Sequence, residues 1–94
     1  MNRQEIISKI AEHLRIQGAV KAELFGSFSR GEDKPDSDID ILVEFQEERS
    51  LLDLVRIEQK LSEAVGRKID LVTEASLSPH IRESVNTDRT EVPL

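Results

Sequence analysis

Two aspartates, Asp38 and Asp40, are separated by one residue in a segment that alternates polar and apolar side chains. This alternation predicts a strand from Asp38 to Phe45. Because successive side chains of a strand point to opposite faces, both carboxylates would leave the same face, with Cα atoms about 7 Å apart. Two acids so placed repel each other unless a cation lies between them. Taken alone, the pattern favours solvated acids at the start of a strand.

A third acid, Asp70, lies within another alternating segment, Lys68 to Thr73, in which Ile69 and Leu71 point to the opposite face. An isolated acid would be an unfavourable neighbour for a core. If the two strands pair, Asp70 reaches the face that carries the aspartate pair. Three carboxylates on one face make a site for hard divalent cations, and two such ions about 3.5 to 4 Å apart act in nucleotidyl transfer.

A glycine–serine turn at Gly26 and Ser27 ends the preceding apolar strand. Glycine there lets backbone N–H groups approach an anion, and the serine hydroxyl can donate to a phosphate oxygen. A nucleoside triphosphate would then lie between amide donors and carboxylate-held metal. Arg30, a few residues further on, suits either a phosphate clamp or a surface ion pair with Glu32 or Asp33.

Asp38 and Asp40, together with Asp36 and Glu47, also match the ligand positions of an EF-hand calcium loop. That loop needs a glycine at its sixth position, where the chain has Ile41 in a continuing strand. The pattern therefore disfavours a calcium loop.

Alternating helices and strands must position these residues, and they predict a two-layer α/β (α+β) domain. Its small mixed sheet would carry helices packed on one face and the metal site on the open face. The expected elements are a helix from Glu5 to Ile16, strands from Val20 to Phe25, Asp38 to Phe45 and Lys68 to Thr73, a helix between Ser50 and Gly66 with Leu51, Leu54, Val55, Leu61 and Val65 on one stripe, and a last helix from Pro79 to about Asn86.

Length and composition exclude several classes of binding and catalytic site. The 94 residues suit one domain, residues 1–94, and the formal charge of −6 argues against broad electrostatic binding of nucleic acid or anionic lipid. The absence of cysteine excludes thiolate zinc sites and cysteine nucleophiles. Two distant histidines, His13 and His80, are expected to act as neither base nor ligand, so any metal site must use oxygen ligands. Without a membrane-spanning stretch or a signal peptide, we expect a cytoplasmic protein.

Gly26-Ser27, ten further residues and then Asp38-Ile39-Asp40 resemble the signature of the DNA polymerase β-like nucleotidyltransferase superfamily. The strings GSFSRGEDKPDSDIDILVEF and GRKIDLV are similar to the minimal nucleotidyltransferase (MNT) domains of bacteria and archaea. The resemblance implies a polymerase β-like palm fold, ATP as substrate and two Mg²⁺ ions.

The resemblance also implies roles for particular residues. Asp38 and Asp40 would bind both magnesium ions, and Asp70 would hold the catalytic one and help to activate the acceptor hydroxyl. Contacts to the triphosphate are implied for four residues: Gly26, Ser27, Ser37 and Arg30, the last as a phosphate clamp.

MNT domains are commonly encoded with a helical HEPN (higher eukaryotes and prokaryotes nucleotide-binding) ribonuclease toxin. They neutralise it as antitoxins by transferring AMP from ATP to a toxin hydroxyl, usually of tyrosine. The resemblance therefore implies a magnesium-dependent protein adenylyltransferase in a hetero-oligomer with such a toxin. The alternatives are a catalytically silent module that neutralises by occlusion, and a nucleotidyltransferase that acts on a small molecule. The polar segment from Asn86 to Leu94 departs from the family pattern, which has a longer helix there.

Overall fold

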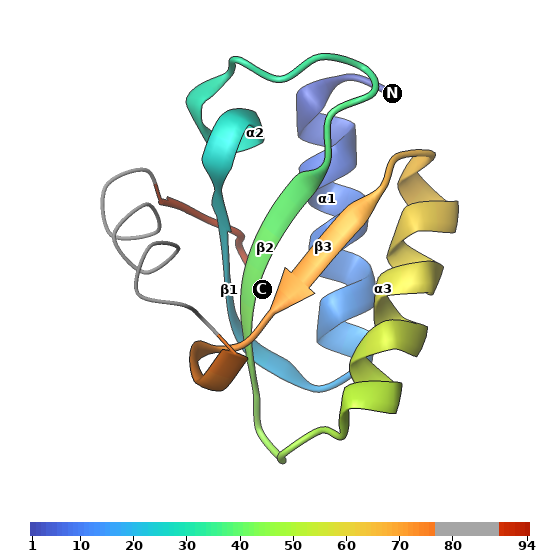
Figure 1. Cartoon of the computed structure of the whole chain (residues 1–94), viewed down its shortest axis with the longest axis vertical. Helices are drawn as coiled ribbons and strands as arrows, with labels where there is room; N and C mark the ends of the chain where they lie inside the picture. Colours follow the sequence, from blue (N-terminus) through green and yellow to red (C-terminus); the bar gives the residue numbers. More distant parts are fainter. Residues whose placement is uncertain (77–88) are drawn as a thin grey trace.

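A four-stranded sheet in the order β3-β2-β1-β4 is the centre of the structure, a computed structural model that describes residues 1–76 and 89–94 (Figure 1). The strands are β1 (Ala19–Phe25), β2 (Ile39–Phe45), β3 (Ile69–Val72) and β4 (Thr90–Glu91). β2 pairs with β3 in parallel, whereas β1 is antiparallel to both β2 and β4. The expected mixed sheet is confirmed. The predicted helix from Pro79 to Asn86, with His80, lies outside the described residues.

Two long helices, α1 (Arg3–Ile16) and α3 (Leu51–Val65), lie side by side along one face of the sheet (Figure 1). Two short helical turns, α2 (Gly26–Arg30) and the 3₁₀ helix η1 (Glu74–Ser76), follow β1 and β3. In the described ranges, no helix has both the length and the apolar character that crossing a membrane requires.

The ends of the long helices are set by local hydrogen bonds. The Asn2 side chain accepts a hydrogen bond of 2.8 Å from the Glu5 N–H at the start of α1. Ser50 and Asp53 form a reciprocal capping box at the start of α3, and Gly66 ends that helix with φ +69°. The helix predicted between Ser50 and Gly66 is therefore confirmed.

The main core lies between the helices and the sheet. The alternation predicted for β2 and β3 is confirmed, because every second residue faces the helices while the aspartates face the other way. The residues that face the helices are Ile39, Ile41, Val43, Ile69 and Leu71. The buried residues of this layer include Ile6, Ile10, Leu14, Leu24, Ile39, Ile41, Val43, Ile57, Leu61, Val65, Ile69 and Leu71. On the opposite face Phe25 and Leu42 are buried against the half-buried Val72, so the face that carries the aspartates also has a small apolar patch.

Two residues of the predicted α3 stripe, Leu51 and Val55, are exposed, and so is Val20 of the predicted first strand. Leu51 is 79% exposed because it is the first residue of α3, where the stripe runs past the core, and Ile57, which the stripe omitted, is buried instead. Val20 is 54% exposed because a bulge between Ala19 and Lys21 shifts the register of β1 and turns Val20 outward.

The segment after residue 88 adds a strand that the sequence analysis did not predict. Thr90 and Glu91 pair with Leu24 and Glu23 of β1, and the Val92 N–H donates to the Ala22 carbonyl at 2.8 Å. Val92 is 2% exposed. A strand of two residues has too little alternation to be recognised, so this part of the chain read only as a polar tail.

Replacing two of the leucines of α3, one buried and one exposed, should separate the observed core from the expected one. Leu61→Ala should lower the free energy of unfolding by about 2–5 kcal/mol, because it leaves a cavity in the main core. Leu51→Ala should change it by less than about 0.5 kcal/mol, because the side chain is already solvated. Urea denaturation measures both values, and similar losses for the two variants would contradict the position of α3.

Candidate active site

Asp40 and Asp70 lie side by side on the open face of the sheet, at the end where β1 finishes and β2 and β3 begin. Asp40 is the direct partner of Asp70 in the parallel β2–β3 pair and of Phe25 in the antiparallel β1–β2 pair. Facing residues of paired strands point to the same side, so the two carboxyl groups share one surface. This register brings together two of the three acids singled out in the sequence.

Gly26 follows Phe25 directly and adopts a φ of +75°. A Cβ atom placed on it would lie 2.5 Å from Oδ2 of Asp40, which is closer than real contacts allow. Glycine is needed here both for the left-handed backbone and for the space that the Asp40 carboxylate occupies. The turn and the aspartate pair are therefore parts of one local arrangement.

The carboxyl group of Asp40 has an unusual pKa. Burial, the negative charges of Asp70 and Asp38, and a hydrogen bond with Asp70 raise it from its ordinary 3.8 to about 6, although the positive charge of Arg30 opposes the shift. The ionised form of Asp40 is thus held in a place that disfavours negative charge. A bound cation would relieve that repulsion.

Asp38 lies one residue before β2, and its carboxylate is 3.7 Å from Nζ of Lys68. This ion pair is largely solvated, so it holds the side chain only weakly. Across the described ranges no three acidic or histidine side chains already stand close enough together to hold one metal ion. The oxygen donors suit magnesium, but the three carboxylates would have to come closer together to share one ion.

The other predicted site residues lie around the same end of the sheet. Arg30 bonds through Nε to Glu32 at 3.1 Å, so one of its two expected ion pairs is present, and its charge also reaches Asp40. Ser37 accepts the Lys34 N–H at 3.0 Å and closes a turn before the aspartates. Ser27 is half-buried in the first turn of α2.

The sequence analysis assigned no role to Arg67 and Lys68, which stand between α3 and β3. Lys68 pairs with Asp38, and its carbonyl accepts the Ile39 N–H at 2.9 Å. Arg67 bonds to Asp33, which had been considered a partner for Arg30. Two adjacent basic residues just before the strand of Asp70 were the available signal.

Comparison with known proteins adds independent information. Residues 5–91 match the family described as nucleotidyltransferase domain. A candidate protein adenylyltransferase of Methanocaldococcus jannaschii is 44% identical over 92 residues, which cover 98% of this chain and 99% of that protein. The protein adenylyltransferase MntA of Thermococcus cleftensis is 44% identical over 68 residues, 72% of this chain and 69% of that protein.

Solved structures that resemble this chain include chains of toxin–antitoxin complexes. A chain in a crystal structure of a toxin–antitoxin with AMP-PNP superimposes with a TM-score of 0.83 at 29% identity, covering 99% of this chain and 73% of that one. A chain in the structure of the tri-AMPylated Shewanella oneidensis HEPN toxin with its MNT antitoxin has a TM-score of 0.79 at 28% identity, covering 98% and 72%.

Asp40→Asn should stabilise the metal-free protein at neutral pH. Folding raises the pKa of Asp40 to about 6, which means that the folded state favours the protonated acid. The stabilisation from this protonated form is fully present below about pH 4 and is lost as the pH rises through 6. Asparagine has the same shape without the charge. The gain in melting temperature over the native chain should therefore be near zero at pH 4 and grow up to pH 7, measured with a chelator present. Asp36→Asn, at an exposed loop position, is the control, and a gain for Asp40→Asn that does not change with pH would contradict the argument.

Gly26→Ala should destabilise the protein more than Gly66→Ala. Both glycines have positive φ, which costs alanine about 1–2 kcal/mol, but only Gly26 faces Asp40, whereas a Cβ on Gly66 would meet nothing within 4 Å. The clash should add about 1–3 kcal/mol. In an Asp40→Ala background this excess should disappear, as a double-mutant cycle by urea denaturation can measure. An excess that persists without the carboxylate would show that the two residues are not in contact.

Proposed function

This chain belongs to the nucleotidyltransferase domain family, and on that basis we propose that it is an MNT antitoxin that transfers AMP from ATP to a hydroxyl group of a HEPN toxin. The names of its relatives, MntA among them, support protein adenylylation, and the similar toxin–antitoxin structures contain AMP-PNP or an AMPylated HEPN toxin. The observation of this chain that carries the proposal is the register that sets Asp40 beside Asp70 and against Gly26. The chain would act as a single domain, residues 1–94.

In the proposed reaction the acceptor oxygen forms a bond to the α-phosphorus of ATP. The bond from that phosphorus to the bridging oxygen breaks, and pyrophosphate leaves. Asp70, the more exposed acid of the pair, takes the proton of the acceptor hydroxyl. No covalent nucleophile of the protein is required, in keeping with a sequence that has no cysteine.

Asp38, Asp40 and Asp70 would hold magnesium, whose positive charge, when bound, would stabilise the negative charge that develops on the phosphate oxygens. The Gly26–Ser27 turn, Ser37 and Arg30 would bind and orient the triphosphate. Arg30 has to leave Glu32 for this, which is a small cost because the ion pair is exposed.

A protein acceptor is favoured by the openness of the site. The aspartates lie on an uncovered sheet face in the described part of the chain, so a partner surface can present a hydroxyl directly to them. A small-molecule acceptor is the second candidate, because a depression of about 340 Å³ on this face is bordered by Leu42, Glu23 and Arg89. That volume is near the lower limit of about 300 Å³ for ligand sites.

Transfer of labelled AMP tests the proposal. The chain is co-expressed with the product of the neighbouring gene, purified through a tag on one of them and incubated with magnesium and ATP labelled at the α-phosphate. AMP should appear on a hydroxyl side chain of the partner, most simply a tyrosine, and mass spectrometry identifies the residue. Asp38→Asn and Asp40→Asn should each lower the transfer at least about 100-fold, because each removes a charge that the transition state needs.

Asp36→Asn is the matched control for this assay, because it removes an exposed acid of the preceding loop and should leave the transfer unchanged. Full neutralisation of the partner without added AMP would support occlusion alone. Label on a small molecule instead of the protein would identify the second candidate acceptor. Undiminished transfer by Asp40→Asn would show that the active site lies elsewhere.

A further inference from the structure

The side chain of Arg67 reaches from the end of α3 into the loop that joins the two halves of the site. This loop, residues 31–38, begins after α2, which carries the glycine–serine turn, and ends at Asp38. The Arg67 guanidinium donates through Nη1 to Oδ2 of Asp33 at 2.8 Å, and through Nη2 to the carbonyls of Lys34 at 2.8 Å and Ser37 at 3.0 Å. Its side chain is only 12% exposed. One buried cation therefore fixes three points of the loop.

The hydrogen bond from Arg67 to the Ser37 carbonyl lies directly beside Asp38, one of the proposed metal ligands. The carbonyl of Ser37 belongs to the peptide bond that leads into Asp38, and the following Ile39 N–H donates to the carbonyl of Lys68 at 2.9 Å. Arg67 and Lys68 thus hold the backbone on both sides of Asp38. The direction in which the Asp38 carboxylate leaves the chain depends on these bonds.

Arg67 also connects the loop to α2. Its guanidinium carbon lies 5.3 Å from the centre of the Phe28 ring, and the guanidinium of Arg3 lies 4.5 Å from the same ring. Phe28 is 2% exposed and follows directly after Ser27. A planar guanidinium can stack on a ring and donate to several acceptors at once, which an ammonium group cannot do.

We propose that Arg67 is a positioning residue of the nucleotide site, which sets Asp38 and the Gly26–Ser27 turn in their relative places by tying the loop between them to Phe28. This inference rests on the proposed function, because it assumes that these groups bind the nucleotide. The burial of Arg67 is not optimal for stability alone. Among the described residues its Nε is buried without a hydrogen-bond partner, which disfavours the folded state.

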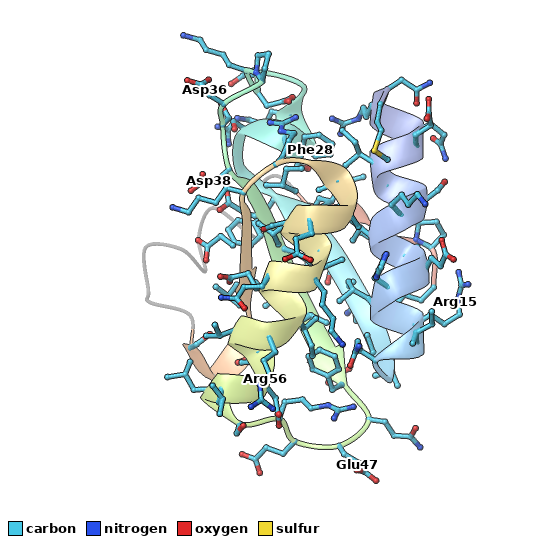
Figure 2. All side chains as sticks on the ribbon, turned by 90° about the vertical axis from the view of Figure 1, so that its right-hand side faces the viewer. Arg15, Phe28, Asp36, Asp38, Glu47 and Arg56 are labelled. Atoms are coloured by element: carbon cyan, nitrogen blue, oxygen red, sulfur yellow. The ribbon has the colours of Figure 1, made fainter. Side chains whose placement is uncertain are left out.

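Arg49 offers a matched control. Its guanidinium lies 5.3 Å from the ring of Phe45, it donates to the carbonyl of Gln17, and within the described ranges its Nε is also buried without a partner. It belongs to the loop of Glu47, which lies at the opposite end of the molecule from Phe28 and Asp38 (Figure 2). Arg49→Lys therefore removes a guanidinium that stacks on a ring and donates to a backbone carbonyl far from the site, although Arg49 makes fewer hydrogen bonds than Arg67.

The test measures the affinity for AMP-PNP in the presence of magnesium by calorimetry, together with thermal stability. Both Arg67→Lys and Arg49→Lys should lower the melting temperature, Arg67→Lys by more because Arg67 makes three hydrogen bonds and Arg49 one. Arg67→Lys should weaken the binding of AMP-PNP by about tenfold or more, the equivalent of one lost hydrogen bond, whereas Arg49→Lys should change it by less than about twofold. Equal affinities for the two variants would overturn the proposal.

A second readout needs no nucleotide. In the ¹⁵N-labelled free protein, Arg67→Lys should shift and broaden the amide signals of residues 33, 34 and 36–38, while Arg49→Lys should leave them unchanged. Unperturbed amide signals would overturn the positioning role. If the native chain fails to bind AMP-PNP while these signals still move, the proposed function fails and the ordering of the loop stands. Should Arg67→Lys not fold, Asp33→Ala removes one of the three contacts and should give smaller changes of the same kind. No change in either readout would then overturn the inference.

Discussion

The carboxyl group of Asp40 is confined from three directions, and most of the site follows from that confinement. On one side the strand register sets it beside Asp70, on the other beside Phe25, and the backbone of Gly26 leaves just enough room for its oxygen. The sheet therefore holds two acids in contact before any cation is present. Folding has to supply the free energy for this arrangement, and the source is the apolar layer on the opposite face, where Ile39 and Ile41 flank Asp40 in sequence and are completely buried.

One face of the sheet thus stabilises the fold, and the other carries the candidate active site. One face is covered by α1 and α3 and contains nearly all of the buried apolar side chains, while the other combines acids with a small apolar patch at Phe25, Leu42 and Val72 (Figure 1). Alternation along β2 and β3 distributes each residue to its face, so a shift of one residue in register would bury the acids and expose the core. The site and the stability of the fold consequently depend on the same register.

Much of this arrangement could be predicted from the sequence, because alternation is a local pattern. Counting residues put Asp38 and Asp40 on one face, and Asp70 with them on the condition that the two strands pair, which they do. The ends of α3 were readable from Ser50 and Gly66. The long-range contacts were not readable. Nothing in the order of residues indicates that Arg67 forms an ion pair with Asp33, or Lys68 with Asp38, because these pairs depend on how the elements pack. Leu51 escaped prediction because the periodic pattern of its helix runs past the end of the core, and Val20 because a bulge in β1 depends on how that strand pairs with β2.

The pairing of β4 with β1 joins residues that lie far apart in the chain, since Thr90 faces Leu24 across the sheet. During synthesis β1, β2 and β3 leave the ribosome well before Thr90, so the outer edge of β1 is open in the nascent protein. An open edge is a template for pairing with other chains, and it is protected in the finished molecule by a strand of only two residues and the buried Val92. Contacts of such long sequence separation form late. Residues 90–92 therefore cover this edge late in folding, and until they pair with β1 the chain is open to aggregation.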